Sequence, residues 1–161
     1  MRPALRRLEP DDWETWRDTR LAALSESPRA FASSLAEEEG YAESDWRDKL
    51  DPAHGLRVVA ADGAGLVGAW VPPDRDGAAK LYSMWVHPLW RGRGVGDLLV
   101  EEVLAWGGDH GHPRVDLWVA EGNVAAARLY RRHGFRMTDE RRPHPGHAGV
   151  FVRLMTRKLG G

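Results

Sequence analysis

The chain has 161 residues, of which 42% are hydrophobic and 29% charged, and its formal net charge is -1. This balance argues against a nucleic-acid binder that works through phosphate contacts, and no apolar run reaches the roughly 18 residues of a membrane helix. Because the chain has no cysteine, it can form neither a disulfide nor a thiolate zinc site, and it has no cysteine nucleophile. The start lacks an apolar secretory segment, so we expect one cytoplasmic domain over residues 1–161.

The first third of the chain reads as a strand followed by helices. Residues 2–8 favour a strand, and residues 9–27 favour a helix with apolar residues at helical spacing. A second helical region covers residues 31–50. It is expected to break at Gly40 and to restart with Ser44 as its N-cap.

The remainder of the chain is mainly extended. The expected elements are a hairpin over residues 55–72, strands over 78–88, 114–120, 136–142 and 149–159, and helices over 95–107 and 123–133. This order predicts an α/β domain, with a mixed central sheet of about six to seven strands flanked by about four helices.

A glycine-rich loop, HPLWRGRGVGDLL, joins the strand over residues 78–88 to the next helix. A strand that enters a helix through glycines aims unpaired N–H groups and the positive end of the helix dipole at one point, which favours an anion. The loop lacks the G-K-[ST] of a nucleoside-triphosphate site, and Asp97 breaks the dinucleotide fingerprint. What remains is R-x-x-G-x-G, formed by Arg91, Gly94 and Gly96. A glycine turn without a ligand is the alternative interpretation.

A second motif follows about 30 residues after Arg91. It reads N-x-x-A-x-x-x-Y-x-x-x-G-F and consists of Asn123, Ala126, Tyr130, Gly134 and Phe135. With both motifs in this order, the stretch from Leu81 to Phe135 resembles the GNAT superfamily of N-acetyltransferases. The flanking elements also fit the family's layout, so the resemblance extends over nearly the whole chain and implies the GNAT fold, with strands splayed at an acetyl-coenzyme A site.

The resemblance implies that the anion is the pyrophosphate of acetyl-coenzyme A, a co-substrate used without a metal. Loop N–H groups would bind it, with the charges of Arg91 and Arg93. The pantetheine arm would run along Met84–Val86, where a bulge would part that strand from residues 114–120. The expected cofactor-binding residues are Met84, Trp85, Val86, Arg91, Gly92, Arg93, Gly94, Val95, Gly96, Asn123, Ala126 and Tyr130.

The resemblance also implies two catalytic roles. The main-chain N–H of Val86 would stabilise the oxyanion, and Tyr130 would protonate the departing thiolate, since a phenol is protonated at neutral pH. From spacing alone, Tyr130 could equally be a core residue, and Asn123 could be a plain N-cap.

The general base is less clearly indicated. Some family members carry a glutamate five residues before the motif asparagine, where this chain has Trp118. We take Glu38 as the candidate base, from the run Glu37–Glu39, with His87 or a chain of water molecules as alternatives.

Trp70, Trp85 and Trp118 lie on successive central strands and, with Glu39, are the candidate acceptor residues. An aromatic wall formed by these tryptophans would favour an amine with an aromatic or apolar group, whereas packing under the helices is the alternative. His144 and His147 have H-x-x-H spacing in the last loop. Without a helix or a third ligand, we interpret them as loop residues at the substrate rim, and we expect no metal.

The sequence therefore predicts an acyltransferase that moves acetyl directly from acetyl-coenzyme A to the primary amine of a small molecule, in a ternary complex. The alternatives are a coenzyme A-binding regulatory module without turnover, an enzyme for protein or peptide amines, and a phosphate-binding enzyme outside the family. Propionyl and succinyl donors also stay open. We expect no nucleic-acid or membrane partner, and a homodimer is an arrangement that the family often adopts.

Overall fold

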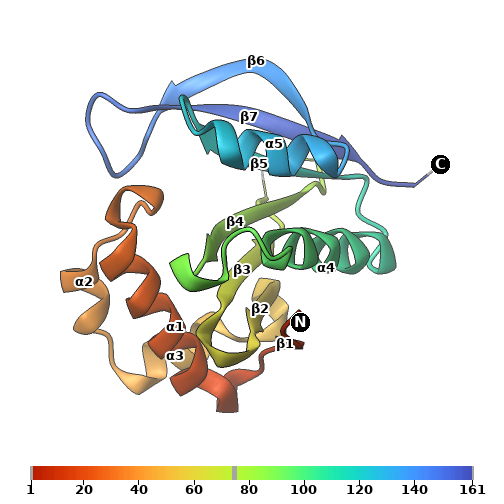
Figure 1. The fold of residues 1–161 in the computed structure, drawn as a ribbon. Helices are drawn as coiled ribbons and strands as arrows, with labels where there is room; N and C mark the ends of the chain where they lie inside the picture. Colours follow the sequence, from red (N-terminus) through yellow and green to blue (C-terminus); the bar gives the residue numbers. More distant parts are fainter. Residues whose placement is uncertain (1, 74–75, 161) are drawn as a thin grey trace.

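The computed structural model describes residues 2–73 and 76–160 as a mixed seven-stranded sheet with helices on both faces (Figure 1). The strand order is β1-β2-β3-β4-β5-β7-β6. The strands are β1 (Leu5–Arg7), β2 (Leu56–Ala60), β3 (Gly65–Trp70), β4 (Ala79–Val86), β5 (Arg114–Ala120), β6 (Arg136–Pro143) and β7 (Phe151–Lys158). The α-helices are α1 (Trp13–Glu26), α2 (Leu35–Glu39), α3 (Glu43–Lys49), α4 (Val95–Asp109) and α5 (Val124–Arg132). The expected α/β class and mixed sheet are confirmed, and no helix of the described chain is long and apolar enough to cross a bilayer.

Two hydrophobic cores lie on opposite faces of the sheet. On one face, α4 contributes Leu99 and Val103, which pack against central-strand residues such as Leu117. On the other face, Trp16 of α1 and Trp46 of α3 are buried. Because both faces are covered, the central strands are nearly continuously apolar instead of alternating, as expected for a strand buried on both sides.

The sheet parts between β4 and β5, its one parallel pair among the strands described. These two strands are in register only at Ala79↔Val115 and Lys80↔Asp116. Further along, β4 carries an extra residue relative to β3, and Ser83 adopts the left-handed conformation with φ of 59°. This bulge bends β4 away from β5, so the strands diverge toward the glycine loop.

Two helix boundaries differ from the sequence-based expectation. Helix α3 begins at Glu43, before Ser44, because the carboxylate of Asp45 accepts a hydrogen bond from the N–H of Ala42 (2.9 Å). Helix α4 runs through Gly107 and Gly108 to Asp109. A Cβ on Gly107 would lie 2.9 Å from the side chain of Leu159, so a glycine is needed there for packing and does not end the helix. The break at Gly40 produces two separate helices, α2 and α3.

Candidate active site

The glycine loop shapes the start of α4. Gly92 and Gly94 have φ of 76° and 82°, and Gly94 is the N-cap of the helix. Both need the left-handed conformation that glycine adopts at no steric cost. Gly96 serves packing, since a Cβ there would lie 3.1 Å from the side chain of Leu129 in α5. The three glycines therefore expose the first N–H groups of α4 and bring it against α5.

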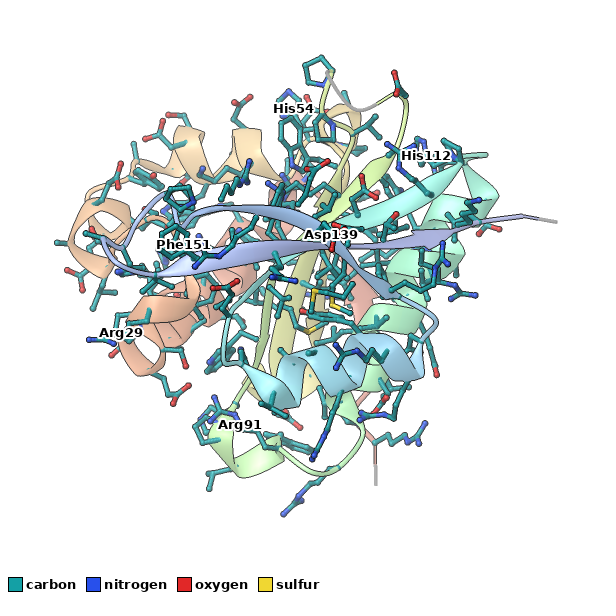
Figure 2. The ribbon with its side chains drawn as sticks, turned by 90° about the horizontal axis from the view of Figure 1, so that it is seen from above. Arg29, His54, Arg91, His112, Asp139 and Phe151 are labelled. Carbon is teal, nitrogen blue, oxygen red and sulfur yellow. The ribbon has the colours of Figure 1, made fainter. Side chains whose placement is uncertain are left out.

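A cavity of about 650 Å³ opens beside this loop, between the end of β4 and helix α5; we call it the glycine-loop cavity. Ten of the twelve residues expected to bind the cofactor line it: Met84, Trp85, Val86, Arg91, Gly92, Gly94, Val95, Gly96, Asn123 and Ala126. Arg93 and Tyr130 are the two that do not. Figure 2 shows Arg91 at the turn that precedes α4, close to the start of α5.

Arg91 is anchored within the protein. Its Nε donates to the carbonyl of Val86 (3.0 Å), and Nη2 donates to Glu26 (2.7 Å). Hydrogen bonds from Ser27 and from the indole of Trp85, together with Arg91, hold the pKa of Glu26 below its ordinary value. Arg91 therefore ties the glycine loop to α1, and its charge is balanced by a carboxylate.

Other charges at the cavity differ in how they are balanced. Asp97, in the first turn of α4, pairs with Arg132 (3.0 Å) and His133 (2.8 Å) of the α5 end. Burial raises the pKa of Asp97, but the hydrogen bonds from His133 and Arg132 outweigh it and lower the pKa overall. Arg93 instead stacks on Trp90, 5.5 Å from the ring centroid, with no ion pair to the described residues. Among the residues of the loop itself, Arg93 thus carries the charge that no carboxylate balances within the described chain, and a Cβ on Gly94 would lie 3.4 Å from the guanidinium of Arg2.

The backbone of Val86 faces the opening. The next N–H, of His87, donates to the carbonyl of Ala64, just before the start of β3 (2.8 Å). Because successive N–H groups of a strand point to opposite sides, the N–H of Val86 points away from β3, toward the gap left by β5. This orientation suits a donor to a carbonyl in the glycine-loop cavity.

Helix α5 supplies the opposite wall. The side chain of Asn123 accepts from the N–H of Ala126 (3.2 Å), so Asn123 is the N-cap, as its position indicates. Tyr130 lies one turn beyond Ala126 on the same helix face. It is 6% exposed and packs edge-on against Phe135, with 5.8 Å between ring centroids. Burial raises the pKa of the Tyr130 phenol, which keeps it protonated at neutral pH.

A second cavity, of about 340 Å³, lies on the other side of the β4 bulge; we call it the aromatic cavity. Its walls include Phe31, Trp70, Tyr82, Trp118, Arg142 and His144. The two cavities share Ala30, and they meet at neighbouring residues of the bulge, where Ser83 lines one and Met84 the other. A molecule in each would therefore approach the other at the bulge.

The β6–β7 loop closes the aromatic cavity against the segment after α1 (Figure 1). Nε2 of His147 lies 3.0 Å from the carbonyls of both Pro28 and Phe31, so this nitrogen carries a proton and donates. Gly146 sits so close to Ala32 that a Cβ would lie 2.5 Å from its carbonyl oxygen. His144 lines the cavity, and burial and His147 lower its pKa, so its imidazole is neutral at pH 7. His144 thus lies at this cavity, whereas His147 fastens the loop to the segment after α1.

Glu38 has a different environment from that expected of a base. It is 3% exposed, and both its oxygens accept from Arg20, each at 3.0 Å. Arg20 also donates to the Ser83 hydroxyl (2.6 Å), at the bulge itself. Because its oxygens are occupied, Glu38 orients Arg20 and does not face an incoming amine. Neither Glu39, which is exposed, nor His87, whose Nδ1 accepts from the N–H of Leu89, lines either cavity.

Trp70, Trp85 and Trp118 lie on the same face of the sheet, but they differ in whether a helix packs over them. Trp85 is 4% exposed, lies under α1, and donates to Glu26 (2.9 Å). Trp70 and Trp118 lie beyond the helices and line the aromatic cavity. Of the three tryptophans expected to form an aromatic wall, Trp70 and Trp118 do so. Trp85 packs beneath a helix, which was the alternative interpretation.

Sequence reasoning missed several residues. Arg20, Tyr82 and Arg142 line the aromatic cavity although no motif contains them. Strand alternation gave no usable signal for Tyr82, because the bulge at Ser83 breaks the alternation between Tyr82 and Met84. For Arg20 and Arg142 no local signal existed, because tertiary packing alone brings them to β4 and β5.

The chain is similar to known acetyltransferases in sequence. The family model described as acetyltransferase (GNAT) family matches residues 5–135. Mycothiol acetyltransferase of Clavibacter sepedonicus is 33% identical over 138 residues, 83% of this chain but 42% of that protein. The chain thus spans about two fifths of that relative's length. An uncharacterized N-acetyltransferase of Schizosaccharomyces pombe is 30% identical over 68% of the chain and 69% of its own length.

Solved structures show the same fold. The GNAT acetyltransferase from Streptococcus pneumoniae aligns with a TM-score of 0.76 at 23% identity, covering 98% of this chain and 99% of that one. A phosphinothricin acetyltransferase from Sinorhizobium meliloti, solved in complex with AcCoA, aligns with a TM-score of 0.75 at 21% identity, covering 99% and 90%. At these sequence identities, the two alignments show that the chains have the same fold and nothing beyond it.

Proposed function

Because the chain belongs to the GNAT acetyltransferase family, and so is an acyltransferase, we propose that it transfers acetyl from acetyl-coenzyme A to the primary amine of a small molecule. The observation that carries the proposal is the parting of β4 and β5 beside a glycine loop that caps α4. At this gap, the N-terminus of α4, which favours an anion, lies beside the unpaired edge of β4. Acetyl-coenzyme A has a group for each: its pyrophosphate suits the helix N-terminus, and the amides of its pantetheine arm suit the strand edge. The AcCoA complex of the Sinorhizobium meliloti relative, which has the same fold, supports this choice.

The residues fit the donor in three places. The pyrophosphate would lie on the N–H groups of Gly94 and Gly96, with the unpaired charge of Arg93 nearby. Arg91 would hold the loop in place, given its bonds to Val86 and Glu26. The amides of the pantetheine arm would pair with the open edge of β4.

The transfer itself is proposed as a direct attack in a ternary complex. The amine nitrogen forms a C–N bond to the thioester carbonyl, and the N–H of Val86 stabilises the negative oxygen; such a donor contributes on the order of 10²–10³ in rate. When the C–S bond breaks, the phenol of Tyr130 gives its proton to the thiolate, the positively charged nitrogen loses a proton to water as the amide forms, and the tyrosinate regains a proton from water. The raised pKa of Tyr130 keeps the phenol proton available.

The amine must first lose its own proton. Glu38 is engaged by Arg20, and Nδ1 of His144 accepts from the N–H of Gly146 (3.0 Å), so neither offers a free base. We propose that water takes the proton, one of the routes considered from the sequence. Positive charges in the aromatic cavity favour this loss, because they lower the pKa of an amine beside them.

A thermal-shift titration tests the donor. Acetyl-coenzyme A at 100 times its dissociation constant should stabilise the fold by about 2.7 kcal/mol, and more than ADP or pantetheine. No shift with a folded protein would reject the proposal. A thiol-release assay with an amine panel then separates an enzyme from a regulatory module, and the cysteine-free chain contributes no thiol background.

The acceptor and the oligomeric state are two finer points of the proposal. The name of the Clavibacter relative makes the unacetylated precursor of mycothiol one compound of the panel, beside peptide amines. The homodimer stays a prediction, which light scattering coupled to gel filtration measures.

A further inference from the structure

The aromatic cavity is rich in positive charge. Three cationic side chains line it, from Arg20, Lys80 and Arg142, and no Asp or Glu of the described chain is among its lining residues. It continues into a neighbouring cavity of about 500 Å³ that shares Trp70, Lys80, Trp118 and Arg142 and that Asp116 also lines. An amine approaches as an ammonium ion, and cations of the same sign repel it. A plain alkylamine is therefore a poor match to this cavity.

Arg142 differs from the other cations in its surroundings. Glu38 engages Arg20 through two oxygens, whereas no ion pair joins Arg142 to a carboxylate of residues 2–73 and 76–160. Its guanidinium lies over the ring of Trp118, 4.0 Å from the centroid. Stacking fixes the plane of a guanidinium but leaves its N–H edges free, the arrangement that binds a carboxylate through two parallel hydrogen bonds.

Its neighbour Arg141 provides the contrast. Arg141 stacks on Phe151 (3.7 Å) in the same way, but it also donates to Glu121 (2.8 Å). Successive residues of β6 point to opposite sides of the sheet, so only Arg142 reaches the aromatic cavity. Arg141 and Arg142 thus each stack on an aromatic ring, but only Arg141 also pairs with a carboxylate.

We propose that the acceptor is an amine that also carries a carboxylate, as an amino acid does, and that Arg142 binds this carboxylate. The apolar or aromatic body of the acceptor would lie against Trp118 and Trp70, and its amine would point to the β4 bulge. A cavity of about 340 Å³ suits a molecule of amino-acid size. This inference rests on the proposed function and names its substrate class.

The test uses matched pairs of amines with acetyl-coenzyme A. Leucine, methionine, phenylalanine and tryptophan are each assayed beside the corresponding amide, which keeps the body and removes the negative charge. The amide's amine has the lower pKa and is more reactive near pH 7.5, because no carboxylate stabilises its ammonium form. A higher kcat/KM for the acid, by tenfold or more, must therefore come from the protein.

Variants then locate the effect. Arg142→Gln should raise KM for the acid at least tenfold with little change in kcat, and should leave the amide unaffected. Arg141→Gln is the matched control and should change neither. Transfer that is as fast to the amides, no transfer to any acid, or an Arg142→Gln variant with an unchanged KM would overturn the inference. If the proposed function itself fails, acetyl-coenzyme A gives no thermal shift and no amine releases thiol, which is a distinct outcome.

Discussion

The phenol ring of Tyr82 occupies the space beside Gly68 that a side chain would need. A Cβ on Gly68 would lie 2.5 Å from Cζ of that ring, across the β3–β4 pair. Tyr82 is thereby laid flat over β3, with the guanidinium of Arg57 5.1 Å from its centroid. Burial raises its pKa, so the phenol in the wall of the aromatic cavity is neutral.

Gly68→Ala should therefore destabilise the protein by about 1–3 kcal/mol, the usual cost of overpacking. Denaturant unfolding measures the free energy, and in a Tyr82→Leu background the loss should be smaller. Gly40→Ala is the control, because a Cβ there would meet only the carbonyl of Glu37, at 3.4 Å. An equal loss of unfolding free energy in the original protein and in the Tyr82→Leu background would show that the Tyr82 ring does not cause the destabilisation.

Glu38→Gln should cost about 3 kcal/mol of unfolding free energy, because it leaves the buried charge of Arg20 without its partner. The adjacent, exposed Glu39→Gln should change the free energy by less than about 0.5 kcal/mol. Both are measured by chemical denaturation. A stable Glu38→Gln that loses the acid limb of the pH–rate profile would instead identify Glu38 as the base.

Gly94→Glu should abolish binding of acetyl-coenzyme A, since it adds bulk and negative charge to the proposed pyrophosphate site. Gly111→Glu is the matched control: its φ of 71° imposes the same backbone strain and it adds the same charge, at the other end of α4. Calorimetry should find unchanged affinity in the control. Retained affinity in Gly94→Glu would place the ligand elsewhere.

Tyr130→Phe should lower turnover about 10²-fold while the dissociation constant of acetyl-coenzyme A stays within about twofold, since only the proton donor is removed. Steady-state kinetics and calorimetry measure the two quantities. Tyr41→Phe, which changes a ring packed on Trp46, should leave both unchanged. Full turnover in Tyr130→Phe would assign the acid to another group.

The ion pairs of Asp97 should make stability depend on pH in the acid range. Its pKa is lowered in the folded protein, so the folded state binds this proton more weakly than the unfolded state. The stabilisation, about 1 kcal/mol, is complete above the ordinary pKa of about 3.9 and is lost as the pH falls through the lower folded-state pKa.

Comparison of Asp97→Asn with the original protein from pH 7 down to pH 3 measures this effect. The difference in unfolding free energy should shrink at the acid end. Glu101→Gln, an exposed change on the same helix, should show no such trend. A constant difference across the range would mean that Asp97 acts through packing.

The local parts of this site were predictable from the sequence, and the tertiary parts were not. The glycine loop and the Asn123 helix depend on residues within one turn or loop, where spacing fixes geometry. By contrast, 63 positions separate Arg20 from Ser83, and no periodicity links them.

The tryptophans show the same division. Alternation allowed some of the three tryptophans to share one sheet face, but whether a helix covers each of them depends on the path of α1. That path follows from packing of the whole domain. The environment of Glu38 was missed for a similar reason, since its carboxylate is occupied by an arginine from another helix.

The meagre pairing of β4 with β5 also divides the molecule into two parts. Strands β1–β4 pair antiparallel with one another, strands β5–β7 do likewise, and two registered residue pairs join the groups. The main-chain amides along this seam should exchange with deuterated water by local opening, ahead of those inside either group. A ligand that contacts both groups of strands would slow the amide exchange in both groups at once. The bound substrate would then join the two groups into one cooperative folding unit.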